Sequence, residues 1–252
     1  MKCDPVLKHR RAAWPPIGAL LACVLVSGGL GVAGKASEAA AATEFHKILF
    51  LGNSITLHGP APAIGWLGKW GMAASAEDKD FVHRVTSSLA KTTGTAPEVM
   101  VKNIADFERQ YATYDVEGKL KEAFAFGADL VIVAIGENVP NLASAEAKTQ
   151  FASAMTKLLG GLKAASHPTI VVRSCFWANK AKDQILQKAC EQADGIFVDI
   201  GSLGKDQSNY ARSERPYKHA GVGNHPGDKG MQAIANAILG AINSQRGKET
   251  AK

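Results

Sequence analysis

The stretch Ile48-Leu49-Phe50-Leu51-Gly52-Asn53-Ser54-Ile55-Thr56 places a serine directly after a run of large apolar residues. Continuous apolar runs of this kind are typical of strands that are buried on both faces of a parallel sheet. The glycine and asparagine that follow favour a turn. Ser54 is therefore expected where a buried strand turns towards a helix, and its hydroxyl is the best nucleophile candidate in the chain.

Strands and helices are predicted to alternate along the chain. Apolar, β-branched runs occur at 47–51, 98–103, 130–135, 169–173 and 196–200. Stretches with helical spacing of apolar residues are found at about 78–91, 116–126, 143–165, 180–193 and 228–242. This alternation predicts an α/β fold with a five-stranded parallel sheet.

The 252 residues, 46% of them hydrophobic, fit one domain with a full core, which we place at 43–245. Residues 1–42 have a basic start, an apolar stretch at 17–33 and small residues at 36–42. This order is typical of a signal peptide and a linker, so we expect export to the periplasm or the exterior. Residues 246–252 are expected to be a disordered tail.

The net charge of +6 arises partly from the leader, and the other basic residues are scattered among acidic ones. This pattern argues against a nucleic-acid partner. No segment after the leader approaches the roughly 20 apolar residues that a membrane-spanning helix needs. The sequence therefore predicts no stable membrane span once the leader is cleaved.

Two cysteines, Cys175 and Cys190, lie outside the leader. In an exported protein they could form a disulfide, and the alternative is two buried thiols. Neither cysteine has the spacing to a histidine that a metal site needs, and no phosphate-binding loop or dinucleotide fingerprint occurs. We predict no metal and no cofactor.

Asn138 and His225 are the expected partners of Ser54, since Asn138 follows the third apolar run and His225 precedes the final helix. Ligands of open parallel sheets bind beyond the carboxyl ends of the strands. A histidine there could take the proton of a serine nucleophile. The backbone amides of Ser54 and Ala105 and the side chain of Asn138 could stabilise a developing oxyanion.

Two irregular stretches, 57–76 and 202–227, are expected to be loops near this site. His58 and His219 lie on them and are weaker candidates for contacts with a substrate. Trp66 and Trp70, with Trp177 further along, could stack on a sugar ring. Packing of the glycine-rich loop is an equally good explanation for these tryptophans.

The ordered motifs resemble those of the SGNH hydrolase superfamily, the GDSL-like esterases and lipases. Four blocks carry the resemblance over about 47–242: Leu51-Gly52-Asn53-Ser54, Asn103-Ile104-Ala105, Gly136-Glu137-Asn138, and His225-Pro226 with Gly230-Met231. Asn53 stands where aspartate is common in the family, and Ala105 where the family usually has glycine. The resemblance implies a flavodoxin-like three-layer α/β/α sandwich, with Ser54 as nucleophile and His225 as base.

One position departs from the family pattern. The family generally has an aspartate three residues before its histidine, and this chain has Val222 there. A backbone carbonyl or another acid could orient the histidine instead. The candidates are the Val222 carbonyl, Asp228, Glu214 and Asp199, and we favour a Ser-His dyad.

The resemblance thus implies an exported serine esterase that removes acetyl or another small acyl group from a carbohydrate. Loss of the acid at Val222 motivates a different interpretation, a catalytically impaired carbohydrate-binding module. An acyltransferase that uses the same residues is a third.

Overall fold

A computed structural model of the chain describes residues 44–249. The whole of the predicted leader and linker, 1–42, and residues 250–252 lie outside this range, as does any test of export. The described residues all belong to one compact unit. None of the helices in the described range is long and apolar enough to cross a membrane.

Five parallel strands form the sheet, in the order β2-β1-β3-β4-β5. Their bounds are Lys47–Gly52 for β1, Glu98–Asn103 for β2, Leu130–Ala134 for β3, Thr169–Arg173 for β4 and Ile196–Val198 for β5. The chain reverses its direction of travel across the sheet between β1 and β3, which is the usual ligand-binding point of such sheets. The predicted strand positions and fold class are confirmed.

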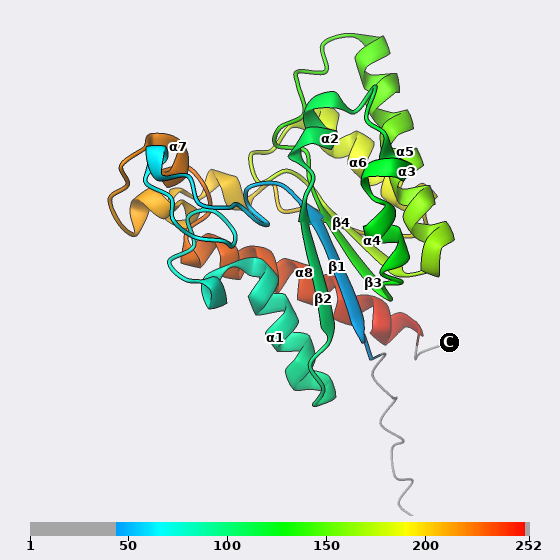
Figure 1. Cartoon of the computed structure of the whole chain (residues 1–252), viewed down its shortest axis with the longest axis horizontal. Coiled ribbons are helices and arrows are strands. Elements are labelled where there is room, and N and C mark those ends of the chain that lie inside the picture. Colours follow the sequence, from blue (N-terminus) through cyan, green and yellow to red (C-terminus); the bar gives the residue numbers. More distant parts are fainter. Residues whose placement is uncertain (1–43, 250–252) are drawn as a thin grey trace, which may run out of the picture. The chain divides into compact units, whose positions relative to one another are not determined.

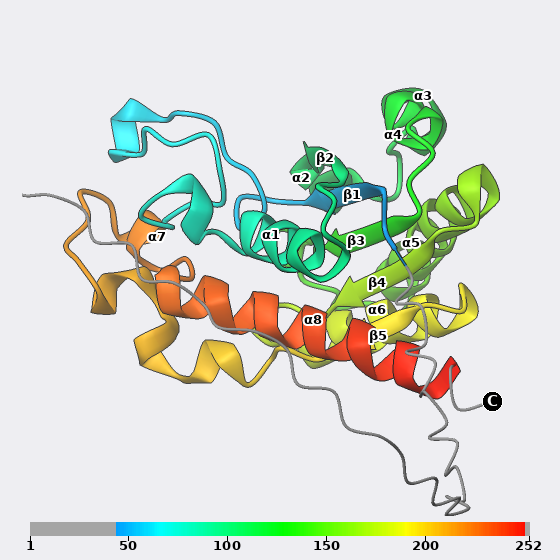
Figure 2. The ribbon, with the colours of Figure 1, turned by 90° about the horizontal axis from the view of Figure 1, so that it is seen from below.

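Helices cover both faces of the sheet (Figures 1 and 2). One face carries α1 (Phe81–Thr93) and α8 (Asp228–Glu249), and the other carries α5 (Ala145–Ser166) and α6 (Lys180–Gln192). The described residues also form five short 3-10 helices and four shorter α-helices: α2 (Ala105–Gln110), α3 (Val116–Lys119), α4 (Lys121–Ala125) and α7 (Ala220–Gly223). This is the three-layer sandwich that the sequence predicted.

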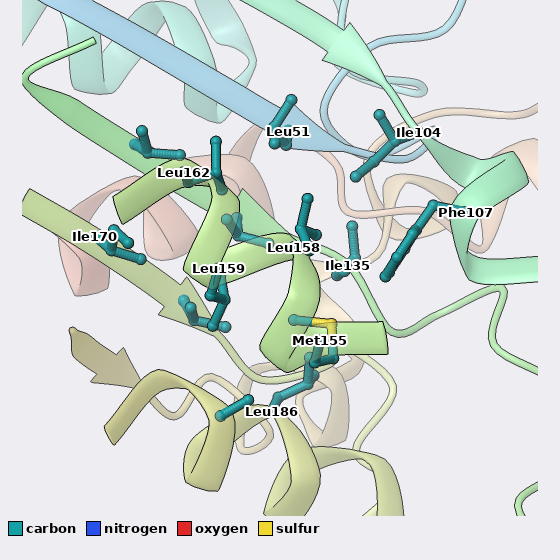
Figure 3. Packing of buried hydrophobic residues seen from close by; sticks show 14 of the residues in the cluster. Leu51, Ile104, Phe107, Ile135, Met155, Leu158, Leu159, Leu162, Ile170 and Leu186 are labelled. Carbon is teal, nitrogen blue, oxygen red and sulfur yellow. The ribbon is translucent and has the colours of Figure 1, made fainter. Parts of the chain in front are cut away.

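The two cores follow from the alternation of side chains along each strand. On β1, Leu49 and Leu51 pack with α5 and α6, whereas Ile48 and Phe50 pack with α1 and α8. Figure 3 shows side chains of α5 filling the space between the sheet and Leu186 of α6. Because both faces of β1 are buried, its carboxyl end is held firmly and gives a fixed base for the serine turn.

Helix boundaries differ from the predictions at three places. The helix expected at 116–126 is divided, because Leu120 leaves helical geometry while its side chain stays buried. The six-residue α2 was not predicted, since it is too short to show a helical period. At the other end of the chain α8 continues to Glu249, so residues 246–249 are helical and not a disordered tail.

Gly127 and Gly240 provide a matched test of the backbone. A methyl group at either position would meet no atom within 4 Å, but Gly127 has a φ of +66° while Gly240 lies inside α8. Gly127→Ala is expected to lower the free energy of unfolding by about 1–2 kcal/mol, because L residues are strained at positive φ. Gly240→Ala should raise it by about 0.5–1 kcal/mol. Urea denaturation of both variants measures the difference, and equal effects would contradict the assigned conformations.

Candidate active site

Ser54 and His225 meet at the carboxyl edge of the sheet although 171 positions separate them in the sequence. Ser54 lies in the turn after β1, and His225 lies between α7 and α8. The Ser54 Oγ is 2.8 Å from Nε2 of His225. The structure therefore brings together the predicted nucleophile and the predicted base at hydrogen-bond distance.

A backbone carbonyl holds the other side of the His225 ring. Nδ1 lies 2.7 Å from the Gly221 carbonyl oxygen, which can only accept a hydrogen bond. Nδ1 must therefore carry the proton, and in a neutral ring Nε2 is then the acceptor for the Ser54 hydroxyl. Burial lowers the pKa of His225 below 6.5, and a charge on His58 lowers it further, so the ring is neutral at pH 7.

The candidates for orienting His225 have other partners. The Val222 carbonyl accepts the backbone N–H of His225 at 3.0 Å. Asp228 accepts from Ser75, and Glu214 accepts the first backbone N–H groups of α8. Asp199 accepts from Ser174 and Gly201. The group that contacts the His225 ring is the Gly221 carbonyl, four positions earlier in the chain, and the Ser-His dyad stays a prediction.

Two groups are free to bind an oxyanion beside Ser54. The Ser54 N–H has no acceptor among the described residues. The Asn138 side chain donates one Nδ2 hydrogen to Glu108, at 2.7 Å, and its second hydrogen has no acceptor in that same range. Both residues line the same pocket.

The Ala105 amide differs from the prediction. Ala105 lines the pocket, but its N–H donates to the Asn103 Oδ1 at 2.9 Å. The Asn103 Nδ2 is itself held by the Leu57 carbonyl, at 2.8 Å. This local side-chain bond competes with any oxyanion for the Ala105 N–H.

The pocket above Ser54 has a volume of about 410 Å³. Eight of its thirteen lining residues have polar side chains and the others are apolar or glycine, and the pocket is open to a small or partly inserted substrate. The lining comprises Ser54, His58, Ile64, Met72, Asn103, Ala105, Asp106, Arg109, Asn138, His219, Gly221, Val222 and His225. Across the described residues no cluster of histidine, cysteine or acidic side chains could hold a metal ion.

Similar folds occur among solved structures, although no protein-family model and no curated protein sequence matches this chain. A GDSL-like lipase from Bacteroides ovatus matches with a TM-score of 0.52 at 12% identity, over 79% of this chain and 99% of that chain. A family two carbohydrate esterase from Clostridium thermocellum, in complex with cellohexaose, matches with a TM-score of 0.50 at 14% identity, over 80% of this chain. The matched structures include GDSL-like lipases, an acylhydrolase and carbohydrate esterases, which belong to the SGNH superfamily.

The chain has the SGNH hydrolase fold. It spans 65% of the length of the Clostridium esterase and 56% of that of a further matched structure, from Bacillus subtilis.

Val222, three residues before His225, is buried in a small apolar cluster. Trp66, Met72, Ala73 and Ala211 form this cluster with it. The glycine-rich loop 57–76 thus packs against the turn that carries His225. At this position an apolar side chain packs in the cluster, and the Gly221 carbonyl contacts the His225 Nδ1 instead of a carboxylate.

The weaker substrate candidates separate into two groups. His58 and His219 both line the pocket. Trp66 and Trp70 do not line it, because their rings pack edge to face at 5.6 Å within the loop cluster. Trp177 is partly exposed and lies edge-on to the His225 ring, at 5.6 Å between ring centroids.

Several residues to which the sequence analysis assigned no role surround the site. Glu108, Glu137 and Arg173 form a buried polar group beneath it, together with Asn53. Gly136 has a φ of +127°, and a methyl group there would lie 2.5 Å from the Cys175 Sγ. Only glycine fits this bend, which turns Asn138 towards the pocket.

The two cysteines are free, buried thiols, so the disulfide alternative is wrong in this structure. The Cys175 Sγ lies against Gly136 and the Cys190 Sγ against Gly195, so the sulfur atoms face different neighbours. Burial raises the pKa of Cys175 well above its usual range and that of Cys190 to about 12. Thiols in this state are poor nucleophiles.

Peptide mapping checks the state of these thiols. Denatured, unreduced protein treated with iodoacetamide and cut with trypsin should give separate, alkylated peptides for Cys175 and Cys190. Before denaturation both should react slowly, because buried, protonated thiols do not attack the reagent. One linked peptide in the unreduced sample would contradict the assignment.

Proposed function

We propose that this chain is a serine esterase that acts on a small acyl ester. The observation that carries the proposal is the 2.8 Å contact between the Ser54 Oγ and the His225 Nε2, with Nδ1 held by a carbonyl. A neutral histidine with its Nε2 lone pair on a serine hydroxyl is the arrangement that nucleophilic catalysis needs. The SGNH fold, found mostly among esterases and lipases, supports the same chemistry.

The proposed reaction has two steps with the same residues. The Ser54 Oγ bonds to the ester carbonyl carbon while its proton passes to the His225 Nε2. The tetrahedral oxyanion accepts from the Ser54 N–H and the free Asn138 Nδ2 hydrogen. It collapses as the alcohol leaves with the proton from Nε2. Water then attacks the acyl-enzyme in the same way and releases the acid and free Ser54.

A carbohydrate ester is the proposed substrate class. The pocket of about 410 Å³ admits a short acyl group, and its polar lining suits hydroxyl groups. His58 and His219 are the proposed contacts for such groups. The Clostridium esterase of this fold was solved with cellohexaose, which also supports a glycan. The basic and apolar leader supports export to where glycans are found.

Replacing the two central residues tests the esterase proposal. Ser54→Ala and His225→Ala should each lower kcat with p-nitrophenyl acetate by roughly 10³-fold or more, because nucleophile and base act as a unit. Acetate release from a panel of acetylated glycans should fall in parallel. Ser87→Ala, which changes an exposed serine on α1, should leave the rate unchanged. Equal rates for wild type and Ser54→Ala would refute the proposal and favour a binding module.

The pH dependence follows from the His225 environment. Burial lowers the pKa of this ring below 6.5, so the base form is lost only as the pH falls through that lower value. The kcat/KM of the proposed esterase should therefore rise through a midpoint below 6.5 and stay level at neutral pH. His58→Gln should move the midpoint to higher pH, because it removes a nearby charge that lowers the pKa. A midpoint above 6.5 in the wild type would contradict this.

A further inference from the structure

Glu108 is a fully buried carboxylate directly beneath the proposed oxyanion donors. It lies on α2 and accepts four hydrogen bonds from two other segments. The Oε1 accepts from Asn53 Nδ2 at 3.1 Å, from Gly136 N at 2.6 Å and from Asn138 N at 3.2 Å. The Oε2 accepts from Asn138 Nδ2 at 2.7 Å.

Both side-chain oxygens of Glu108 face hydrogen-bond donors. The side chain at this position must therefore offer an acceptor at each of the two atoms. Burial and the charge of Glu137 raise the pKa of Glu108, and the donated hydrogen bonds oppose this. The Arg173 Nη1 lies 2.6 Å from Glu137 and helps to keep the pKa of Glu137 low, although burial acts in the other direction. Arg173 thus neutralises one carboxylate of the pair, and the hydrogen-bond donors compensate the other.

The bond to Glu108 fixes the direction of the Asn138 amide. An amide group is planar, so one hydrogen held by a carboxylate sets the direction of the second hydrogen. The opposite end of the amide is only weakly held, by Arg109 at 3.5 Å from Oδ1. The Gly136 N and Asn138 N bonds hold the surrounding loop to the same carboxylate. Glu108 is therefore the main restraint on where the free Asn138 hydrogen points.

Asn53 extends this restraint to the serine turn. Its Nδ2 lies between Glu108 and Glu137, at 2.6 Å from the latter, while its Oδ1 accepts the Ile55 N–H. An aspartate at 53 would place a third carboxylate against the two that are already buried there, which is strongly unfavourable. The buried carboxylates thus give a physical reason for asparagine at this position.

We propose that Glu108 is a positioning residue for the oxyanion hole, acting chiefly through Asn138. The proposal rests on the esterase function proposed above and goes further, since it names a residue that never touches the substrate. Its role is to aim a donor at the place where negative charge develops. Misdirecting such a donor affects the transition state more than substrate binding.

Glu108→Gln tests this role, because a glutamine must turn an N–H towards one of the four donors. We expect kcat with p-nitrophenyl acetate to fall by roughly 10- to 100-fold, and KM to change by less than about 3-fold. Asn138→Ala alone should lower kcat by roughly 10²- to 10³-fold. In the Asn138→Ala background, Glu108→Gln should lower kcat by no more than about 3-fold, because the amide that Glu108 orients is already absent. Glu122→Gln, at an exposed carboxylate on α4, should have no effect.

Independent, multiplicative losses in the double variant would overturn the proposal, since they would mean that Glu108 acts without Asn138. If Glu108→Gln does not fold, Glu108→Asp is the alternative variant. It keeps the charge but is one methylene too short to reach Asn138, and it should give the same pattern.

A crystal structure of the folded variant gives a readout without activity: the Asn138 amide should be turned from its wild-type direction. An unmoved amide would refute the positioning role. If wild type and Ser54→Ala have equal rates, the esterase proposal fails, and the crystal structure alone decides the role of Glu108.

Discussion

The parallel sheet imposes the constraint on which the candidate site depends. Strands β1, β2 and β3 are neighbours and run in the same direction, so the segments that follow them emerge at one edge. The parallel arrangement of these strands is enough to bring Ser54, Ala105 and Asn138 to the same pocket. Only His225 comes from elsewhere, and α8 packs along the sheet so that its first residues lie at the same edge (Figure 2). Burial of both faces of β1 makes this arrangement rigid.

Hydrogen bonds to buried or backbone groups then refine the positions. His225 is oriented by a carbonyl, Asn138 by a buried carboxylate, and the serine turn by Asn53. Each of these restraints lies on the protein side of the group it holds, which leaves the opposite side open to the pocket. In a low-dielectric interior such bonds are strong, and unpaired polar groups are unfavourable. The site is thus held by a connected polar layer between the sheet and the pocket.

The sequence predicted the parts of this site that depend on strand ends. Ser54 and Asn138 follow apolar runs, and His225 precedes a periodic helix, so their common edge could be inferred without a structure. Glu108 could not be found in this way, because it lies in a six-residue helix and its partners are 28 to 55 positions away. The role of the Gly221 carbonyl could not be predicted either, because it is a main-chain group and no side chain in the sequence indicates it. The separation of Cys175 from Cys190 depends on how α6 packs, and spacing along the chain does not determine that.

The carbonyl that holds His225 has a consequence for how this site can change. A carboxylate partner is a side chain, so one substitution removes it and a change of pH can discharge it. The Gly221 oxygen belongs to the main chain, so replacing side chains one at a time leaves it in place, and no proton can neutralise it. Only a change in the path of α7 can move it. Val222 and the tryptophans packed against it hold that path, so the packing of the loop fixes the position of the carbonyl that contacts His225.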